Sequence, residues 1–361
     1  MGATNGLAPA AIAEHLRRLV VGQREALAEI AIAVSKKIAG LNVGNVLMIG
    51  SSGTGKTTLM RAVESYLASD PELAHRSTAV RLHAGVLAEE AVEGHAGAAV
   101  LDRLAEKGRR DLGPEADRDT VLERVRHGIV FVDEVDKIRS QVGGRPNVAG
   151  IRAQEALLTL IENEKVPYKM PDWAGGDEIE VDSRRLLFIC GGAFEGLYDA
   201  VYDRVTIGRD RGALQAVTVV DGGELTEKLH FSLRNWLKAD DLFEYGMTPQ
   251  FLSRFESRVL LEDLSEEALV QIFLNSPDSS LVHAKQFFSA FGVDLAISPG
   301  AVRRVAREAA SQPRFGARAL KEVFRRVIRD YEYDPIAAGG ADGTLMIDVP
   351  EVEEALGEHD T

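Results

Sequence analysis

The stretch that decides the fold is residues 45–58, NVLMIGSSGTGKTT, which reads as a buried strand, a glycine-rich turn and the start of a helix. Val46 to Ile49 are continuously apolar, as in a parallel strand covered on both faces. An amphipathic run follows from Lys56 to about Ser69 and predicts the helix. The turn between them fits the pattern G-x-x-x-x-G-K-[ST] with Gly50, Gly55, Lys56 and Thr57.

This turn has the chemistry of a phosphate site. Glycines let successive backbone N–H groups point inward at phosphate oxygens, and the helix N-terminus adds partial positive charge. We expect Lys56 to reach the β- and γ-phosphates and the Thr57 hydroxyl to bind Mg²⁺. The sequence therefore predicts a nucleotide site, with these cofactor-binding residues in the loop: Ser51, Ser52, Gly53, Thr54, Gly55, Lys56, Thr57 and Thr58.

A second motif, GIVFVDEVDKI at residues 128–138, predicts another buried strand that ends in two carboxylates. Ligands of open α/β sheets bind at the carboxyl ends of the strands, so Asp133 and Glu134 should face the phosphate loop. We expect Asp133 to hold Mg²⁺ through water and Glu134 to activate the attacking water. The two motifs together favour an ATPase over a simple nucleotide binder.

The composition sets outer limits on the function. The chain has 361 residues, enough for about two domains, and a formal net charge of −14, which argues against a general nucleic-acid binder. Its one cysteine, Cys190, excludes an internal disulfide and cysteine-based metal clusters, and we interpret it as a core residue. No apolar run is long enough to span a membrane, and no signal-peptide pattern begins the chain, so we expect a cytoplasmic protein.

The pattern along the chain predicts a large α/β domain at residues 1–262 and a smaller, mostly helical domain at 263–361. In the large domain we expect a helix at 9–20 and, after a break at 21–23, a second helix that ends at about residue 38. Further helices are expected at 101–107, 151–163 and 225–237, and further strands at 79–82, 186–190 and 257–261. Residues 108–119 read as an exposed connection or helix cap, 140–150 as a mobile loop and 203–223 as a surface excursion. In the small domain we expect helices at 265–286, 299–311 and 317–331, a lone strand at 344–348 and an acidic tail from 351.

These motifs together resemble the AAA+ unfoldases of the Clp family, most closely the ATPase core of ClpX, with HslU next. Residues 50–58 resemble the Walker A loop and 128–138 the Walker B segment, while 153–163, 188–194 and 264–273 match further stretches. Val20-Val21-Gly22-Gln23 resembles the box that packs on adenine, which adds Val21 to the cofactor-binding residues. YGMTPQFLSR at 245–254 resembles the arginine-finger segment, and Gly316-Ala317-Arg318 the sensor-2 motif.

The resemblance implies ATP and Mg²⁺ as cofactors and an AAA+ P-loop domain followed by a helical lid domain. It implies a catalytic set of Lys56, Glu134, Arg254 and Arg318, with Arg318 on the nucleotide. Arg254 lies beyond the last helix of the predicted sheet, so it cannot easily reach its own phosphate loop. A finger supplied between subunits implies a ring, by analogy with the family a homo-hexamer that acts on protein partners; we expect no membrane and no nucleic-acid partner.

The chain also departs from the ClpX pattern. Nothing here can form the family's cysteine-ligated zinc domain. The aromatic pore loop aligns with Ala91 to Gly94, where Val92 replaces the tyrosine, and a valine offers a substrate less contact area. In the peptidase-docking loop, Ile207-Gly208 is followed by Arg209 in place of phenylalanine, and a guanidinium cannot enter an apolar pocket cheaply.

Four functional hypotheses follow. The leading one is a ring-forming ATPase that remodels or unfolds a protein partner without delivering it to a ClpP-type peptidase. The alternatives are a full unfoldase subunit of an ATP-dependent protease and an ATP-switched assembly scaffold. A nucleic-acid motor is disfavoured by the acidic balance and the lack of a basic, aromatic stripe.

Overall fold

The computed structural model describes residues 7–70, 73, 76–92, 94–113, 115–162, 165–207, 216–221, 224–229 and 233–357. The Gly208 and Arg209 positions of the docking-loop comparison, and Glu93 of the pore-loop comparison, lie outside these residues. The chain divides into two compact units, each described by itself below. One comprises residues 33–49 and 67–260; the other comprises residues 1–32, 50–66 and 261–361. The division predicted at residue 262 stays a prediction.

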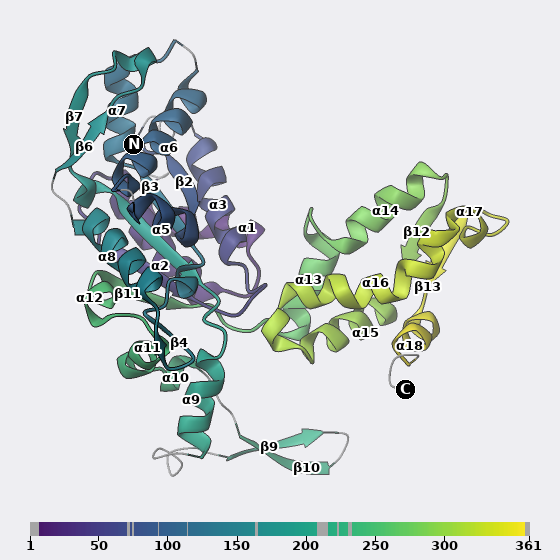
Figure 1. Cartoon of the computed structure of the whole chain (residues 1–361). Coiled ribbons are helices and arrows are strands. Elements are labelled where there is room, and N and C mark those ends of the chain that lie inside the picture. Colours follow the sequence, from purple (N-terminus) through teal and green to yellow (C-terminus); the bar gives the residue numbers. More distant parts are fainter. Residues whose placement is uncertain are drawn as a thin grey trace. The chain divides into compact units, whose positions relative to one another are not determined.

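The first unit is built on a five-stranded parallel sheet in the order β11-β1-β8-β3-β2 (Figure 1). The sheet confirms the predicted α/β class and the strands read from the apolar runs. The three inner strands, β1, β8 and β3, are short, apolar and largely buried, as expected where helices cover both faces, whereas the edge strands β2 and β11 also carry exposed polar residues. The strands are β1 Asn45–Ile49, β2 Ala79–His83, β3 Ile129–Asp133, β8 Leu187–Gly192 and β11 Phe255–Leu260.

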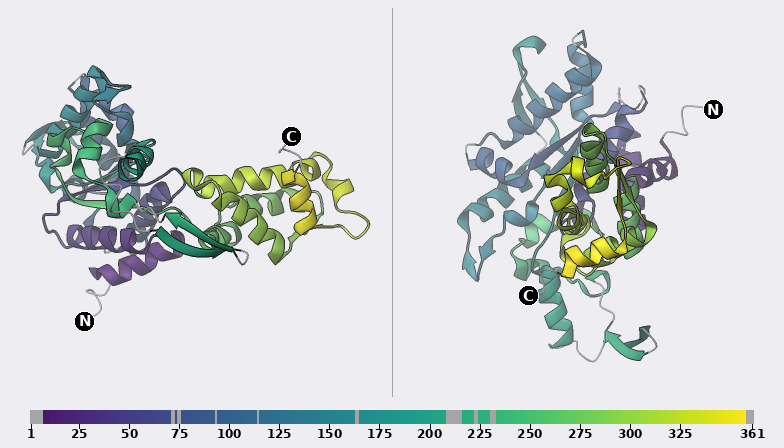
Figure 2. Two further views of the ribbon diagram at one scale, coloured as in Figure 1. Left: turned by 90° about the horizontal axis from the view of Figure 1, so that it is seen from below. Right: turned by 90° about the vertical axis from the view of Figure 1, so that its right-hand side faces the viewer.

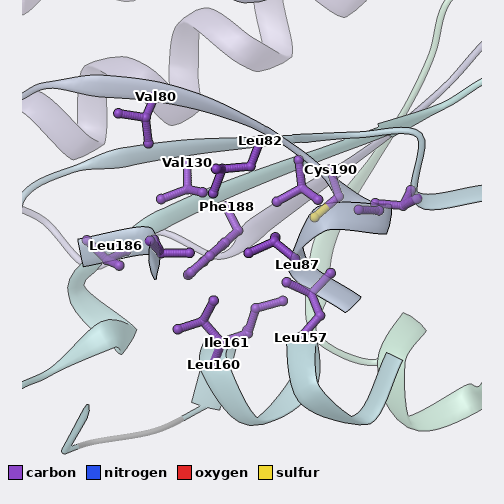
Figure 3. Packing of buried hydrophobic residues seen from close by; sticks show 14 of the residues in the cluster. Val80, Leu82, Leu87, Val130, Leu157, Leu160, Ile161, Leu186, Phe188 and Cys190 are labelled. Carbon is purple, nitrogen blue, oxygen red and sulfur yellow. The ribbon is translucent and has the colours of Figure 1, made fainter. Parts of the chain in front are cut away.

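The core of this unit lies between the sheet and its helices. Figure 3 shows Val80, Leu82, Val130, Phe188 and Cys190 from the strands facing leucines from two helices. Cys190 is fully buried, and this burial raises the pKa of its thiol, which confirms it as a packing residue. The helices that supply the facing leucines are α5 (Ala84–Val92), with Leu87, and α8 (Val148–Glu162), with Leu157 and Leu160.

The segment between β2 and β3 is more helical than its sequence suggested. Residues 101–107 belong to a longer helix, α6 (Ala96–Leu112), and α7 (Arg118–Arg126) occupies part of the predicted connection at 108–119. The prediction was wrong there because a buried arginine stabilises the segment. Arg124 is 1% exposed, donates to the Gly108 carbonyl oxygen at 3.0 Å and pairs with Asp111 at 3.5 Å.

Residues 140–150, predicted as a mobile loop, form an ordered hairpin that runs into α8. Strands β4 (Gln141–Val142) and β5 (Arg145–Pro146) pair across Gly143-Gly144, both with positive φ as a tight hairpin turn requires. The Ser140 N–H donates to the Gly246 carbonyl oxygen at 2.8 Å. A second hairpin, β6 (Val166–Lys169) with β7 (Glu178–Val181), was not predicted.

The helix predicted at residues 225–237 is also wrong. Strand β10 (Glu224–Leu229) occupies its first half and pairs antiparallel with β9 (Ala216–Asp221), and only Leu233–Trp236 form a short helix, α10. The β-branched run AVTVVD favours a strand and gives the next segment a partner, which local helical spacing cannot show. Between β8 and this ribbon lies α9 (Leu197–Thr206), and before β11 lie α11 (Ala239–Tyr245) and α12 (Pro249–Leu252).

The second unit contains α1 (Pro9–Leu19), the start of α2 (Arg24–Ile38), most of α3 (Lys56–Ala68) and a helical cluster from residue 261 onward. In that cluster α15 and α16 lie side by side in every view (Figures 1 and 2). Its helices are α13 Glu266–Asn275, α14 Ser280–Ala290, α15 Pro299–Ala310, α16 Ala317–Tyr333, α17 Pro335–Ala338 and α18 Val349–Gly357.

Two predictions for this cluster need correction. The single helix expected at 265–286 is two helices, because Pro277 disfavours helical geometry at Ser276 and Ser279 caps a new helix by accepting from the Val282 N–H. The strand at 344–348 is not alone: β13 (Thr344–Ile347) pairs in parallel with β12 (Asp294–Ile297). Across the residues that the structure describes, none of the helices combines the length and apolarity of a bilayer span.

Candidate nucleotide-binding site

The loop between β1 and α3 has the backbone geometry of a phosphate cradle. Gly53 and Gly55 have φ of +76° and +105°, values that side chains rarely allow. The Lys56 ammonium lies over the loop and donates to the carbonyl oxygens of Gly50 at 2.5 Å and Ser51 at 2.9 Å. The first turn of α3 carries no acidic residue of its own that would offset the positive end of the helix. This donor set suits an anionic phosphate chain.

The start of α16 touches this loop directly. The Ala317 N–H donates to the Gly53 carbonyl oxygen at 3.1 Å. A Cβ on Gly53 would lie 2.2 Å from the Phe315 carbonyl oxygen, and one on Gly316 would lie 2.7 Å from the Gly53 carbonyl carbon. Both glycines are therefore required for the close backbone approach. The contact brings the first turn of α16, which carries Arg318, onto the phosphate loop.

A buried glutamine joins the adenine-box segment to both the loop and the connection into the helical cluster. Gln23 is 3% exposed; its amide nitrogen donates to the carbonyl oxygens of Thr54 at 3.2 Å and Glu262 at 2.8 Å. Its amide oxygen accepts from the Glu262 N–H at 2.9 Å. Val21, the predicted adenine contact, packs against the apolar core of the helical cluster. Hydrogen bonds of Gln23 thus join the adenine-box segment, the phosphate loop and the connection at Glu262.

The loop is also held through Ser51 and Asp263. The Ser51 hydroxyl donates to the Asp263 carboxylate at 3.1 Å, and burial raises the pKa of that carboxyl group despite this bond. An acidic group beside a phosphate site is unfavourable when charged, and a raised pKa lessens that cost. Sequence reasoning did not single out Asp263, because no local motif marks it.

The two predicted carboxylates lie at the carboxyl end of β3. The Asp133 carboxylate accepts the Glu134 N–H at 3.0 Å, and Glu134 has a left-handed backbone with φ of +61°. Such strain in a non-glycine residue is characteristic of functional sites that their surroundings hold in place. Here the turn is anchored by buried Asp136, which accepts from the Ala193 N–H at 3.2 Å. In the parallel sheet, β1 and β3 end at the same edge, with β8 between them.

Arg254 lies at the other edge of the same sheet. It immediately precedes β11, whose first residue, Phe255, pairs with Asn45, the first residue of β1. The Asn45 side chain donates to the Arg254 carbonyl oxygen at 3.2 Å, and the Arg254 guanidinium pairs with Glu162. Because β1 separates Asn45 from the phosphate loop, Arg254 is about 16 Å of strand away from the start of that loop. Pairing of β11 with β1 thus places Arg254 at the amino end of β1.

The residues present fit the expected cofactors by their chemistry. The cradle, the helix N-terminus and Lys56 suit a nucleotide phosphate chain. The Thr57 hydroxyl and the Asp133 carboxylate are hard oxygen donors of the kind that Mg²⁺ prefers. Within the described ranges, no group of three or more His, Cys, Asp or Glu side chains forms a metal cage. A metal here is thus expected to share its ligands with substrate phosphate and water.

Some stabilising residues were missed by sequence reasoning. Gln154 is 1% exposed and donates to the carbonyl oxygens of Ile138 at 2.7 Å and Gly246 at 2.9 Å, and it accepts from Thr248. It therefore ties the turn after Glu134 to the segment that leads to Arg254. The only available signal was a polar residue on the apolar face of a predicted helix.

Comparison with known proteins agrees with this geometry. The model of the AAA domain (Cdc48 subfamily) matches residues 41–258, and the chain belongs to this family of ATPases. It binds and hydrolyses ATP as an α/β AAA+ protein. The chain is ClpX-like within that family.

Three curated relatives carry that similarity. The "ATP-dependent Clp protease ATP-binding subunit ClpX 3" of Methylococcus capsulatus is 30% identical over 97% of this chain and 83% of its own length. The ClpX subunit of Azotobacter vinelandii is 30% identical over 88% of this chain and 67% of the relative. The ClpX subunit of Treponema denticola is 27% identical over 90% of this chain and 77% of the relative.

Proposed function

We propose that the chain forms a homo-hexameric ring that uses ATP to remodel or unfold a protein partner, without delivering it to a ClpP-type peptidase. The observation that carries the ring is the position of Arg254 at the amino edge of the sheet, a strand length away from its own phosphate loop. Its guanidinium is also 45% exposed, so a neighbouring subunit can reach it. An arginine supplied in trans is a recurrent way to stabilise phosphoryl-transfer charge.

The residues have separate roles in the proposed reaction. Lys56, with the backbone N–H groups from Ser51 to Thr58, holds the phosphate chain, and Val21 contacts the adenine. Mg²⁺, held by Thr57 and through water by Asp133, would neutralise charge on the β- and γ-phosphates. The Glu134 carboxylate orients the attacking water and accepts its proton. Arg254 of a neighbouring copy and Arg318 then stabilise the charge that develops on the transferred phosphoryl group.

Coupling to movement would run through the contact between the phosphate loop and α16. The Ala317 N–H bonds to the Gly53 carbonyl oxygen, so a change in loop shape acts directly on the first turn of that helix. Arg318 follows one residue later, and its partner would be the γ-phosphate before hydrolysis. Loss of that phosphate removes the partner, which favours a different position of α16 relative to the loop.

The absence of peptidase delivery is proposed from the sequence at Arg209 and, for substrate grip, at Val92. The experiment described below also tests two alternatives to this proposal. The names of the relatives include a Clp protease, which favours an unfoldase that works with a peptidase. An ATP-switched scaffold is the other, and it predicts that ATP binding without hydrolysis is sufficient for activity.

The experiment measures ATP hydrolysis by the full chain with and without an unfolded model protein, with Glu134→Gln as the non-hydrolysing control. Turnover that rises with the unfolded protein supports an unfoldase. Peptide release from a labelled substrate, with a ClpP-type peptidase added, would contradict the absence of peptidase coupling. Activity that Glu134→Gln retains in full would favour the scaffold, and ATP turnover by Glu134→Gln would refute the assigned catalytic role.

A further inference from the structure

A cavity of about 740 Å³ lies at the amino edge of the sheet, beside the segment that leads into β1. It is distinct from the nucleotide site, because the phosphate loop follows the carboxyl end of β1. Its volume is in the range of small-molecule sites. The cavity is lined by Lys37, Gly40, Leu41, Asn42, Val43, Gly44, His127, Asp182, Arg184, Arg185 and Glu256.

The decisive feature of the cavity is the lysine in its wall. Lys37, on the last turn of α2, is 4% exposed, although its neighbour Lys36 is exposed. Its ammonium forms no ion pair or side-chain hydrogen bond with any residue that the structure describes. Burial, and secondly the charge of Arg185, lowers the pKa of Lys37 to about 8. A buried cation without a counter-charge costs folding free energy, so its presence calls for a compensating anion.

The other cations of the cavity add to this field. Arg185 forms no ion pair with a described residue, and its charge, with that of Lys37, lowers the pKa of His127 in addition to the effect of burial. Of the two carboxylates, Asp182 is paired with a cation and Glu256 is bonded to a neutral N–H group. Asp182 accepts from the Arg184 guanidinium at 3.0 and 3.1 Å, and Glu256 accepts the Gly44 N–H at 2.9 Å. The lining thus carries three cations (Lys37, Arg184 and Arg185) against two carboxylates, and neither Lys37 nor Arg185 forms an ion pair with a described residue.

We propose that this cavity binds a small phosphate-bearing anion, with Lys37 as the buried charge and Arg185 at the exposed side. A phosphate group matches the net positive charge of this lining. Arg guanidinium groups suit phosphate geometry, and Lys acts as a point charge. Arg184 also lines a neighbouring cavity of about 490 Å³ that contains Arg254 and Glu162. The phosphate site thus lies next to the proposed arginine finger, although its ligand is separate from the hydrolysed ATP.

Acetylation of the full-length protein, read by mass spectrometry at individual lysines near pH 8, tests the proposal at the site itself. Inorganic phosphate at millimolar concentration should slow acetylation of Lys37 about tenfold and leave Lys36 unchanged. Adenosine monophosphate as a second probe separates the sources: stronger protection than by phosphate assigns a nucleotide ligand, and equal or weaker protection assigns free phosphate. Protection by neither probe overturns the proposal.

A variant at the exposed side of the cavity provides the second arm. Arg185→Gln removes one cation without disturbing the buried wall, so the protein should fold and phosphate should protect Lys37 less. The matched control is Lys36→Gln, which removes an equal charge from an exposed position of α2 outside the cavity lining and should leave the protection unchanged. Equal protection in wild type and Arg185→Gln, or equal loss in both variants, contradicts a cavity-bound anion.

Discussion

The position of Arg254 makes a quantitative prediction for mixed rings. Glu134→Gln removes the water-activating carboxylate and retains the finger, whereas Arg254→Ala removes the finger and retains the carboxylate. Each variant alone should lose about 10³-fold or more of its ATP turnover, the effect of removing such a group from phosphoryl transfer. Nucleotide binding should persist in both. About 16 Å of strand separates Arg254 from the start of its own phosphate loop, and in the proposed ring the carboxylate and the finger of each site come from two copies of the chain.

The magnitude of recovery follows from this geometry. In an equal mixture that assembles at random, the carboxylate comes from one copy with probability one half and the finger from its neighbour with probability one half. About a quarter of the interfaces are then complete, and turnover should return to about a quarter of the wild-type rate if sites act independently. The assay is steady-state phosphate release after the subunits have been mixed and allowed to exchange. The control is a chain that carries both substitutions, mixed with Arg254→Ala, which offers no complete interface.

Turnover that stays at the level of the separate variants, in rings shown to be mixed, would refute an intersubunit finger. Turnover by Arg254→Ala alone at the wild-type rate would refute any catalytic role for this residue. Recovery far above a quarter would mean that the sites do not act independently, and the dependence on mixing ratio would then measure the coupling.

Three further predictions concern single contacts. Gln154→Leu breaks a fully buried set of hydrogen bonds and should lower the free energy of unfolding by about 3 kcal/mol in urea titrations, whereas exposed Glu155→Leu should change it little. Gly53→Ala combines positive φ with a backbone clash and should weaken binding of a fluorescent ATP analogue at least tenfold; Gly143→Ala, with positive φ in open space, is its control. Lys37→Met should raise the free energy of unfolding by about 3 kcal/mol at pH 7, because the pKa falls from 10.5 to about 8 on folding. The unfolded wild type binds more protons between these values, so wild-type stability rises with pH there, and a gain that does not shrink by pH 10 would contradict the buried charge.

Local patterns predicted the elements that are stabilised locally. The apolar runs at Val46–Ile49 and Ile129–Val132 became central strands because each fills a buried position in a parallel sheet. The break at Pro277 was also present in the sequence, but the helical spacing on both sides concealed it. Strand β10 could not be predicted from its own residues, because its partner β9 determines its conformation.

In the candidate site, too, the contiguous motifs could be predicted from the sequence and the long-range contacts could not. The phosphate loop and the Asp133-Glu134 pair are contiguous motifs whose residue types indicate their chemistry. The Gln23 side chain bonds to the loop and also to Glu262, which follows Gln23 by 239 residues in the chain. No periodicity in the sequence marks such a contact. Arg254 was proposed by resemblance, and its place at the amino end of β1 is visible only in the pairing of β11 with β1.

The hydrogen bond between Gly53 and Ala317 also has a mechanical consequence. Helix α16 has 17 residues, so it is a stiff rod about 25 Å long whose first turn rests on the phosphate loop. Along its length it packs on α14, α15 and α18 through a buried apolar stripe, so the helical cluster moves with it. A tilt of about 10° at Ala317 would carry Tyr333 about 4 Å. A helix held in this way would act as a lever with its pivot at the phosphate loop, and small changes in the loop would become displacements comparable to the width of a side chain.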